Sequence, residues 1–365
     1  MKAGSSGNDH RLTHLIITLL PPYLRQPEMV DGHGPVILSF AMGILYLTVS
    51  CPKNGEVMIH EDMNMKEFVA KFKDDESILL FLFEARWPRG FICPNCGHND
   101  GYRLSDGRTI QCTVCRKQKS ITADTIFERS HIPLTDWFLA IWLVSTDKRG
   151  LSALALSKRL GIRYVSAWNM LRKIRVVMRE RELKLTLAGT IEMDEAFFGG
   201  KRKVPKPGAS PFEGKVEVLV LVESELEEAG NLVMKVIEDD SFENLQEVIE
   251  EKVESDPAGQ LIVTDGLGRH HVVISCGHQL KMHKMSKSEM DSQMAWVSRA
   301  ISNAKALFKG TFHHFCKKSI QAYLDEFCYR WNRREKENRI ASHLAAACAR
   351  TSPCPKPRKT CSAPA

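Results

Sequence analysis

The segment Cys93-Pro-Asn-Cys96 is followed, fifteen residues later, by Cys112-Thr-Val-Cys115. A Cys-x-x-Cys turn presents two thiolates to one metal ion, and two such turns complete a tetrahedral shell of four soft ligands. This spacing is typical of a zinc ribbon, and its expected zinc ligands are Cys93, Cys96, Cys112 and Cys115. A basic helical segment and then an α/β segment with carboxylates follow. This order indicates a protein that holds DNA first and does chemistry on it second.

Other interpretations of the four cysteines explain less of the pattern. Two pairs at this spacing rarely coincide among ordinary buried thiols, and a catalytic dithiol needs only one pair. A disulfide framework is not expected, because eleven cysteines in 365 residues without a clear secretion signal are typical of an intracellular protein. The other cysteines have no ligand-like spacing and are assigned no role: Cys51, Cys276, Cys316, Cys328, Cys348, Cys354 and Cys361.

Length and charge set the frame for the remaining inferences. A chain of 365 residues has room for two or three domains, and 43% apolar residues is ordinary for a globular protein. The net charge is +7, but it is unevenly distributed. Residues 146–184 carry eleven Lys or Arg against three Asp or Glu, whereas residues 217–256 carry fourteen acidic residues against two basic ones. The basic block beside a zinc module indicates contact with phosphates. The acidic block is typical of a solvated helix face.

The first 57 residues differ from the rest of the chain. Residues 36–51 form an apolar run of sixteen, which is short for a helix that must span a membrane. A signal peptide would place its apolar stretch nearer the start, followed by a small-residue cleavage site. We therefore expect residues 1–57 to be an extension of unknown role, outside the functional protein, with a membrane anchor as the alternative. The expected location is the cytoplasm.

The segment 150–175 has the outline of a helix-turn-helix. Ser152 can cap a helix that runs to Leu160, Gly161 supplies the turn, and a second helix begins near Val165. The start of such a second helix enters the major groove, so base contacts are expected from Arg163, Tyr164, Ser166 and Asn169. Phosphate contacts are expected from Arg172, Lys173 and Arg175. The alternative is a helical hairpin that only packs between domains.

After residue 186 the pattern changes to apolar strands alternating with helices. Asp194 lies in the strand 190–200, and Asp265 ends the short buried strand 260–266. Two aspartates at strand ends, joined by a residue from a later helix, form the layout of an RNase H-like nucleotidyl-transfer site. Carboxylate oxygens suit Mg²⁺, and two ions can hold the attacking and leaving oxygens of a phosphodiester. A single Asp at a strand end is more often a cap or a turn residue.

The chain resembles the zinc-ribbon group of bacterial insertion-sequence DDE transposases from about Phe81 to Asn338. The segments that carry the resemblance include the first cysteine pair with its flanks (85–97), 122–127, 133–140, Glu192-Met-Asp-Glu195, Phe198-Gly-Gly200, Thr264-Asp-Gly266, 301–305, 310–313 and 323–334. The resemblance implies a catalytic domain of RNase H-like fold, with metal-dependent DNA cleavage and strand transfer as its activity.

The resemblance also implies roles for particular residues. Asp194 and Asp265 would hold Mg²⁺ or Mn²⁺, with Asn303 as a neutral third ligand and Lys305 near a phosphate. In such transposases a Glu/Arg/Arg set supports the active site, and the corresponding residues are Glu326, Arg330 and Arg333. These three are four and three positions apart, so they share one helix face.

The chain departs from the usual pattern at several positions. The third acidic ligand is replaced by Asn303, as in a branch that carries Asn and Lys here. Ser298 stands where a His is common, and Leu267 stands where an aromatic residue is usual. Residues 269–287 match poorly.

The expected fold is an α+β multidomain chain with a zinc ribbon, a helix-turn-helix and an RNase H-like α/β catalytic domain. Its expected parts are the extension 1–57, a helical segment 58–88, the ribbon 89–130, the DNA-binding helices 131–185, the catalytic domain 186–340 and a disordered tail 341–365. The basic hairpin 201–203 could also touch DNA.

The sequence predicts a transposase that binds the terminal inverted repeats of its element. Its expected partners are the double-stranded DNA of those ends and of the target, and a second copy or more of the chain on DNA. No small-molecule cofactor is expected. Two alternatives stay open: a regulator whose α/β part only dimerises, and a decayed or domesticated copy that binds DNA without catalysis.

Overall fold

The computed structural model describes residues 62–199, 215–225, 228–256, 258–283, 294–312 and 317–353, and the strand pair 40–41 and 44–45. The chain divides into two units, residues 1–55 and 56–365. In the first unit, β1 (Phe40–Ala41) and β2 (Ile44–Leu45) pair antiparallel. The rest of the N-terminal extension and the basic hairpin 201–203 lie outside the described residues. Within the described part of the chain, no helix is long and apolar enough to cross a membrane.

The N-terminal part of the second unit is a small antiparallel sheet beside a group of helices. The sheet contains β3 (Gly101–Arg103), β4 (Thr109–Cys112) and β5 (Gln118–Ser120), with β4 in the centre. The helices are α2 (Met65–Lys71), α3 (Asp75–Arg86), α4 (Leu134–Thr146), α5 (Ala153–Leu160) and α6 (Tyr164–Glu182). One hydrophobic core joins the ribbon to these helices, and the rings of Phe68, Phe72 and Phe138 meet inside it.

The boundaries of these helices follow from local capping. Asn64 and Glu67 form a capping box that starts α2, and the side chain of Asp74 accepts a hydrogen bond from the Ser77 amide to start α3. Two helices therefore occupy residues 65–86, where the spacing of apolar residues alone predicts a single helix. In the helix-turn-helix, Ser152 caps α5 and Gly161 ends it at φ 66°, a left-handed conformation that favours glycine.

The C-terminal part is a five-stranded mixed sheet in the order β10-β9-β6-β7-β8. Its strands are β6 (Thr190–Phe198), β7 (Val216–Ser224), β8 (Ala229–Ile237), β9 (Leu261–Thr264) and β10 (Gln279–Met282). β6, β7 and β8 are antiparallel neighbours, whereas β9 runs parallel to both β6 and β10. This α/β sheet, following a zinc-ribbon region and helices, confirms the predicted fold class.

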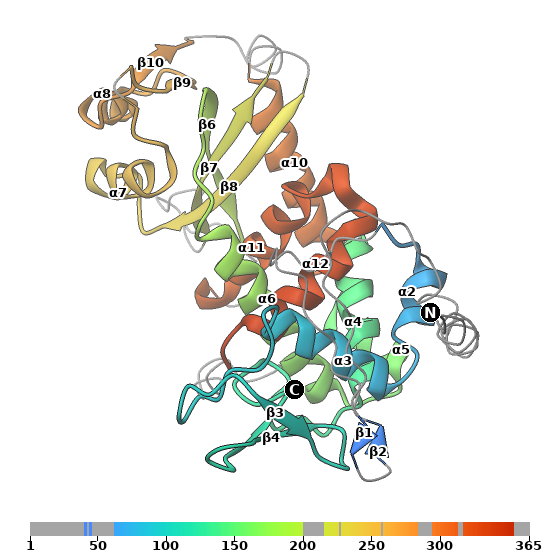
Figure 1. The fold of residues 1–365 in the computed structure, drawn as a ribbon. Helices are drawn as coiled ribbons and strands as arrows, with labels where there is room; N and C mark the ends of the chain where they lie inside the picture. The colour runs from blue at the N-terminus through green and yellow to red at the C-terminus, as the bar shows by residue number, and fades with distance from the viewer. Residues whose placement is uncertain are drawn as a thin grey trace, which may run out of the picture. The chain divides into compact units, whose positions relative to one another are not determined.

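Helices cover both faces of the sheet (Figure 1). The helices α10 (Ala295–Gly310) and α11 (Ile320–Trp331) pack on one face, while α7 (Phe242–Lys252) and α8 (Val272–Ser275) pack on the other. Short 3-10 turns lie at η2 (Gly268–His271), η3 (Lys317–Ser319) and η4 (Arg334–Lys336). Alternation along β6 turns Asp194 toward the α10 face and Glu195 toward the opposite face.

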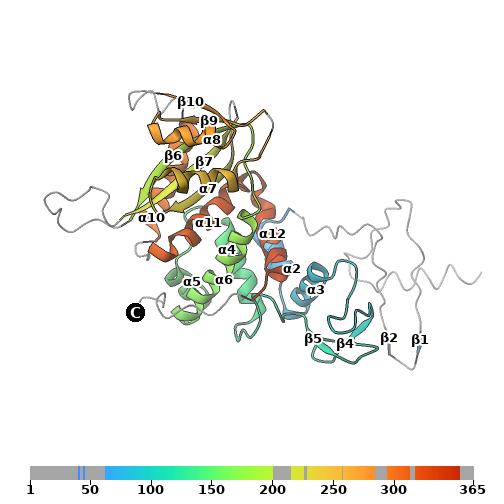
Figure 2. The same ribbon diagram turned by 90° about the vertical axis from the view of Figure 1, so that its left-hand side faces the viewer.

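The prediction of a disordered tail from residue 341 is wrong for its first part. Residues Glu337–Arg350 form α12, and Ile340, Leu344 and Cys348 are among its buried residues. α12 contacts α3, α4 and α6, as Figure 2 also shows. The helix is stable because its alanine-rich face packs into the N-terminal core, so the end of the chain returns to complete that core.

Candidate functional site

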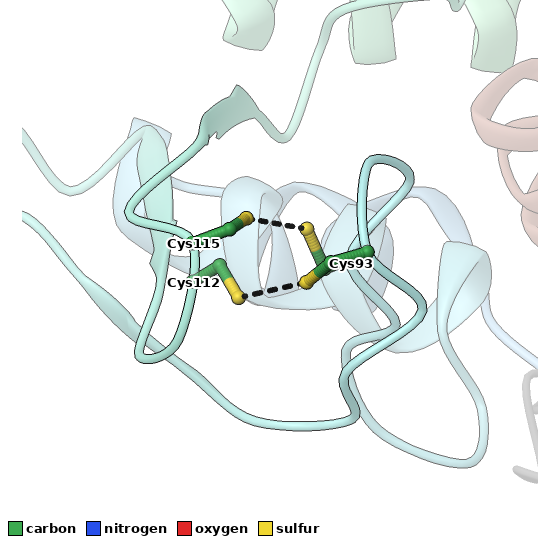
Figure 3. Close-up of side chains that lie close together, drawn as sticks. Cys93, Cys112 and Cys115 are labelled. Carbon is green, nitrogen blue, oxygen red and sulfur yellow. Dashed lines mark hydrogen bonds between the residues drawn. The ribbon is translucent and has the colours of Figure 1, made fainter.

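The four cysteines of the ribbon form one cluster. Sγ of Cys93 lies 3.5 Å from Sγ of Cys115, and Sγ of Cys96 lies 3.7 Å from Sγ of Cys112. All four sulfur atoms lie within 4.8 Å of one another, and Figure 3 shows the side chains converging. A tetrahedral zinc ion with Zn–S bonds of about 2.3 Å requires sulfur atoms about 3.8 Å apart. The donor set therefore fits a structural zinc ion in both ligand type and spacing.

The two cysteine pairs are presented by turns with the same hydrogen bonds. The amides of Gly97 and Arg116 donate to the carbonyls of Cys93 and Cys112, at 2.9 and 3.2 Å. Both donors follow the second cysteine of their pair and have positive φ, 72° and 57°. Glycine adopts this conformation readily, whereas Arg116 adopts it at some cost in backbone strain. The repeated turn explains why the short spacing places two thiols on one side.

The second constellation contains the two aspartates of the α/β domain. β6 and β9 pair in parallel up to Glu192 opposite Val263, and Asp194 and Asp265 each lie two residues further along. The two carboxylates are therefore level at the same edge of neighbouring strands. Each is held through Oδ1, by the Glu195 amide at 2.8 Å and the Leu267 amide at 3.3 Å. Burial, together with the negative charges of Glu195 and Asp265, raises the pKa of Asp194 to about 6.

Glu192 fixes the helix that lies over these aspartates. Its Oε2 accepts a hydrogen bond from the Val297 amide at 2.8 Å, and its Oε1 accepts one from the Ser224 hydroxyl at 2.9 Å. The carboxylate therefore caps the start of α10, where the amides lack partners within the helix. Burial raises the pKa of Glu192, and the bonds to Val297 and Ser224 oppose this rise. Sequence reasoning assigned no role to Glu192, although it belongs to the motif Glu192-Met-Asp-Glu195.

A histidine and a further glutamate support the aspartate pair. Nε2 of His270 lies 2.8 Å from Oε1 of Glu195, and Nδ1 lies 3.3 Å from Oδ1 of Asp265. Arg269 reaches Glu195 at 3.4 Å and Asp240 at 2.5 Å. Burial of Glu195 raises its pKa, but His270 and Arg269 lower it more, so the net pKa is below its ordinary value. Sequence reasoning missed His270, because it lies in the poorly matching stretch after Asp265.

Asn303 and Lys305 lie on different flanks of α10. The core-facing residues of this helix include Ala300, Ala304 and Phe308. At 100° per residue, Asn303 and Lys305 point about 160° apart around the helix axis. Asn303 lines a cleft of about 830 Å³ with residues of α4, α11 and α12. The structure thus brings Asp194 and Asp265 together and places Asn303 on the flank that faces α11.

Glu326 and Arg330 of α11 lie in the interior between α6 and α11, whereas Arg333 lies two residues beyond the end of α11, so the expectation of one shared helix face is wrong for Arg333. Glu326 is fully buried, and its Oε1 lies 3.4 Å from Nη2 of Arg330. Arg330 donates to the Asp147 carbonyl, so it anchors the end of α4. Arg333 donates to Glu182 at 2.6 Å and stacks over the Tyr329 ring. The three residues therefore join helices to one another.

Two predicted phosphate contacts on α6 are contradicted. Only 6% of the Arg175 side chain is exposed, and its Nε donates to Glu326 Oε2 at 2.7 Å. Nζ of Lys173 donates to the Ile126 carbonyl at 2.6 Å and lies over the Trp137 ring. Both cations are directed inward because the C-terminal half of α6 packs between the ribbon core and α11. Neither is placed to reach a DNA backbone.

The start of α6 has the exposure expected of a recognition helix. Arg163 is exposed just before the first turn, and Tyr164, Ser166 and Asn169 are partly exposed along it. The Asn169 amide group donates to the Val165 carbonyl at 3.0 Å, one turn earlier. Arg172 is partly buried. These side chains lie on the N-terminal half of α6, which packs against α5.

Two parts of the chain match family models of known proteins. Residues 186–332 match a family model described as the ISXO2-like transposase domain, and residues 73–118 match the transposase zinc-ribbon domain. Both matches are to domains described as belonging to transposases. The zinc-ribbon match contains all four clustered cysteines. The transposase-domain match runs from before β6 to the end of α11 and contains both aspartates.

Individual relatives are distant. A protein described as uncharacterised, in transposable element ISH50 of Halobacterium salinarum, is 25% identical over 136 residues. That match covers 35% of this chain and 44% of the relative, so the chain spans less than half of that relative's length.

Solved structures of the Mos1 mariner transposition system are similar at 12–13% identity. The Mos1 paired-end complex with Mn has a TM-score of 0.24, over 54% of this chain and 75% of that chain. The strand transfer complex has a TM-score of 0.24, over 57% and 78%.

Proposed function

We propose that this protein is a transposase that binds the terminal inverted repeats of an insertion sequence and catalyses metal-dependent cleavage and strand transfer. The observation that carries the proposal is the placement of Asp194 on β6 level with Asp265, which directly follows the neighbouring parallel strand β9, within the part of the chain that matches a transposase domain. Two carboxylates in one half-buried place repel each other, and a divalent cation relieves that repulsion. Hard oxygen ligands of this kind suit Mg²⁺ or Mn²⁺.

Each residue of the proposed metal site would have a separate role. Asp194 and Asp265 would hold the divalent ions through the oxygens that the Glu195 and Leu267 amides leave available. Bound divalent ions would supply Lewis-acid stabilisation of the attacking and leaving oxygens. Lys305 is exposed on the flank of α10 opposite Asn303, and we propose that it contacts a phosphate near the cut.

The third metal ligand in the proposal is Asn303, which lies on the flank of α10 that faces α11. Asn303 can offer only a neutral amide oxygen, and it lines the cleft that includes Arg330 and Trp331. A direct test is Asn303→Ala, which should reduce cleavage strongly if the residue reaches the metal. Unchanged cleavage would remove Asn303 from the site.

DNA recognition is proposed for the ribbon and the start of α6. The zinc ribbon and the α5–α6 unit share one core, so they would engage the DNA end as one body. Cleavage and joining of two ends call for at least two chains on the DNA, and we propose a homodimer or a higher assembly. The protein would act wherever the cellular DNA lies, at the nucleoid of a bacterial cytoplasm.

One observation favours a second candidate function, DNA binding without catalysis. Residues 295–310, which form α10, contain no aspartate or glutamate, so this helix offers no third carboxylate to the pair. A decayed or domesticated copy would retain the ribbon and α6 and still bind DNA. The candidate predicts an affinity for repeat ends that does not depend on divalent metal.

The deciding experiment is strand cleavage of a duplex that carries the repeat found beside the gene. Zinc-loaded protein is incubated with the duplex in Mg²⁺ or Mn²⁺, and binding is followed in parallel by gel shift. Asp194→Asn and Asp265→Asn should each abolish cleavage and leave binding intact. The matched control is His271→Gln, an exposed change close to Asp265 in sequence. Binding without any cleavage by the unaltered protein would support the second candidate, and cleavage that survives Asp194→Asn would refute the proposed site.

A further inference from the structure

The ladder of hydrogen bonds between β6 and β9 ends before it reaches the aspartates. The last paired residues are Glu192 and Val263, and β9 itself ends at Thr264. Asp265 therefore lies in the loop between β9 and the turn η2, beyond the part that the sheet holds rigidly. Within this loop its Oδ1 accepts a local hydrogen bond from the Leu267 amide at 3.3 Å, and a contact to the sheet would fix it more firmly beside Asp194, because a metal pair needs its ligands held to within a fraction of an ångström.

His270 is placed to supply that contact. The side chain is fully buried, and its two ring nitrogens face two different carboxylates. Nε2 is hydrogen-bonded to Glu195 on the central strand β6 at 2.8 Å, whereas Nδ1 approaches Asp265 in the loop to 3.3 Å, an ion-pair distance without hydrogen-bond geometry. Because β6 is the rigid partner, the ring links the loop to the middle of the sheet. His270 and Glu195 are 75 residues apart in sequence, so this link exists only in the folded chain.

Glu195 is in turn held from its other side. Arg269 lies 3.4 Å from Glu195 Oε2 through Nη2, and its Nη1 lies 2.5 Å from Asp240, which precedes α7. Glu195 is thus in contact with a histidine and an arginine from the same turn, η2. This arrangement uses both carboxylate oxygens of Glu195 for support, whereas its neighbour Asp194 points to the opposite face of the strand.

We propose that His270 and Glu195 form a positioning pair that holds Asp265 in place as a metal ligand. The inference rests on the proposed function, because it assigns the pair a role at the same metal site. Neither residue is a catalytic residue in this scheme, since both act through Asp265. Partners that orient a metal ligand typically contribute 10–100-fold to metal affinity or activity. An ordinary packing role would instead affect only the stability of the fold.

The test measures metal binding directly, on the full-length zinc-loaded protein. Free Mn²⁺ is titrated by electron paramagnetic resonance, with Asp265→Asn defining the binding that belongs to the site. His270→Gln and Glu195→Gln should each raise the Mn²⁺ concentration for half-saturation by about 10–100-fold. His271→Gln, on the same turn but exposed, should leave it unchanged. The double variant His270→Gln/Glu195→Gln should raise the Mn²⁺ concentration for half-saturation by no more than about threefold beyond either single variant. The reason is that both residues act through one contact.

Several outcomes separate the possibilities. Wild-type Mn²⁺ affinity in a folded His270→Gln protein overturns the proposal. If that variant does not fold, Glu195→Gln decides in the same way, because it keeps the size of the side chain. If the unaltered protein binds no Mn²⁺ that Asp265→Asn removes, the proposal also fails. A protein that binds Mn²⁺ but never cleaves DNA contradicts the proposed function and leaves the positioning pair supported by its own readout.

Discussion

Nε of Arg175 donates a hydrogen bond to Oε2 of Glu326 at 2.7 Å, and the pair lies in the interior. Arg175 belongs to α6, whose first turns are the proposed DNA-reading surface, and Glu326 belongs to α11, which packs on the catalytic sheet. The guanidinium also stacks over the Tyr323 ring at 4.2 Å. One continuous helix therefore connects the proposed DNA-binding part to the α/β domain, and this buried pair stabilises the connection.

Removing one partner of this pair should destabilise the protein strongly. Glu326→Ala leaves the Arg175 charge buried, and such changes typically lower the free energy of unfolding by about 3–5 kcal/mol. The double variant Arg175→Met/Glu326→Leu should lose less than the sum of the two single changes. The measurement is urea unfolding. Lys148→Ala serves as control, because its pair with Glu337 is exposed and should contribute less than about 1 kcal/mol. If Glu326→Ala and Lys148→Ala lower the free energy of unfolding by similar amounts, the assignment of Arg175 and Glu326 as a buried pair is contradicted.

Asp325 should make stability depend on pH. Burial, aided by the negative charge of Glu182, raises the pKa of Asp325 to about 6, although Gln321 donates to it. A folded pKa above the unfolded value of 3.8 means that the acid is favoured in the folded state. The stabilisation is complete below pH 4 and is lost as the pH rises through 6.

Asp325→Asn should therefore stabilise the protein at pH 7.5 by about 1–3 kcal/mol, since each pKa unit corresponds to about 1.4 kcal/mol. The advantage over wild type should shrink as the pH falls from 7 to 4. Denaturant unfolding at a series of pH values checks this. A constant difference between the two proteins at every pH would show that the pKa of Asp325 is the same in the folded and unfolded states.

Zinc removal should unfold the ribbon first. The four thiols surround one metal position, and binding and folding are coupled in modules of this size. One zinc ion per chain is expected by metal analysis. Chelation or Cys112→Ser should make the ribbon sensitive to protease and lower DNA affinity, while the α/β sheet stays folded. Cys276→Ser is the matched control, because this thiol lies outside the cluster. Protein purified without chelator that holds no zinc would refute the prediction.

Changes along α6 should separate DNA reading from structural support. Arg163→Ala or Asn169→Ala should each weaken binding to the repeat by about 1–3 kcal/mol, with little effect on random DNA. Lys173→Ala should instead lower thermal stability and leave the salt dependence of binding unchanged, because Nζ is bound to the Ile126 carbonyl. If Lys173 contacted a phosphate, Lys173→Ala would reduce the slope of log affinity against log salt concentration by about one. Fluorescence anisotropy at several salt concentrations distinguishes these results, and equal losses on both DNAs for Arg163 would argue against base contacts.

The end of the chain should contribute to stability. Leu344 in α12 is fully buried, so Leu344→Ala should lower the free energy of unfolding by about 2–5 kcal/mol. Lys336→Ala, on the exposed turn before α12, should change it by less than about 0.5 kcal/mol. Thermal and urea unfolding give both values. A neutral Leu344→Ala would mean that α12 does not pack as described.

Features that depend on neighbouring residues were determined by the sequence itself. The zinc ligands were predicted correctly as a cluster, because each pair is formed by one short turn. The helix-turn-helix outline followed from Ser152 and Gly161, whose capping roles are local. Asp194 and Asp265 were singled out because each was expected at the end of a strand. In the structure Asp265 does follow the end of β9, but Asp194 lies in the middle of β6, and their parallel register came only from the structure.

The tertiary structure decided which partner each charged side chain meets. Arg175 and Lys173 look like phosphate ligands in a basic segment, but their acceptors are 151 and 47 residues away in sequence. The alanine-rich end of the chain has little periodic signal, and it becomes helical because α3, α4 and α6 provide an apolar surface. His270 finds Glu195 across 75 residues. Local patterns specify turns and caps, whereas buried charges take partners that only the folded chain brings within reach.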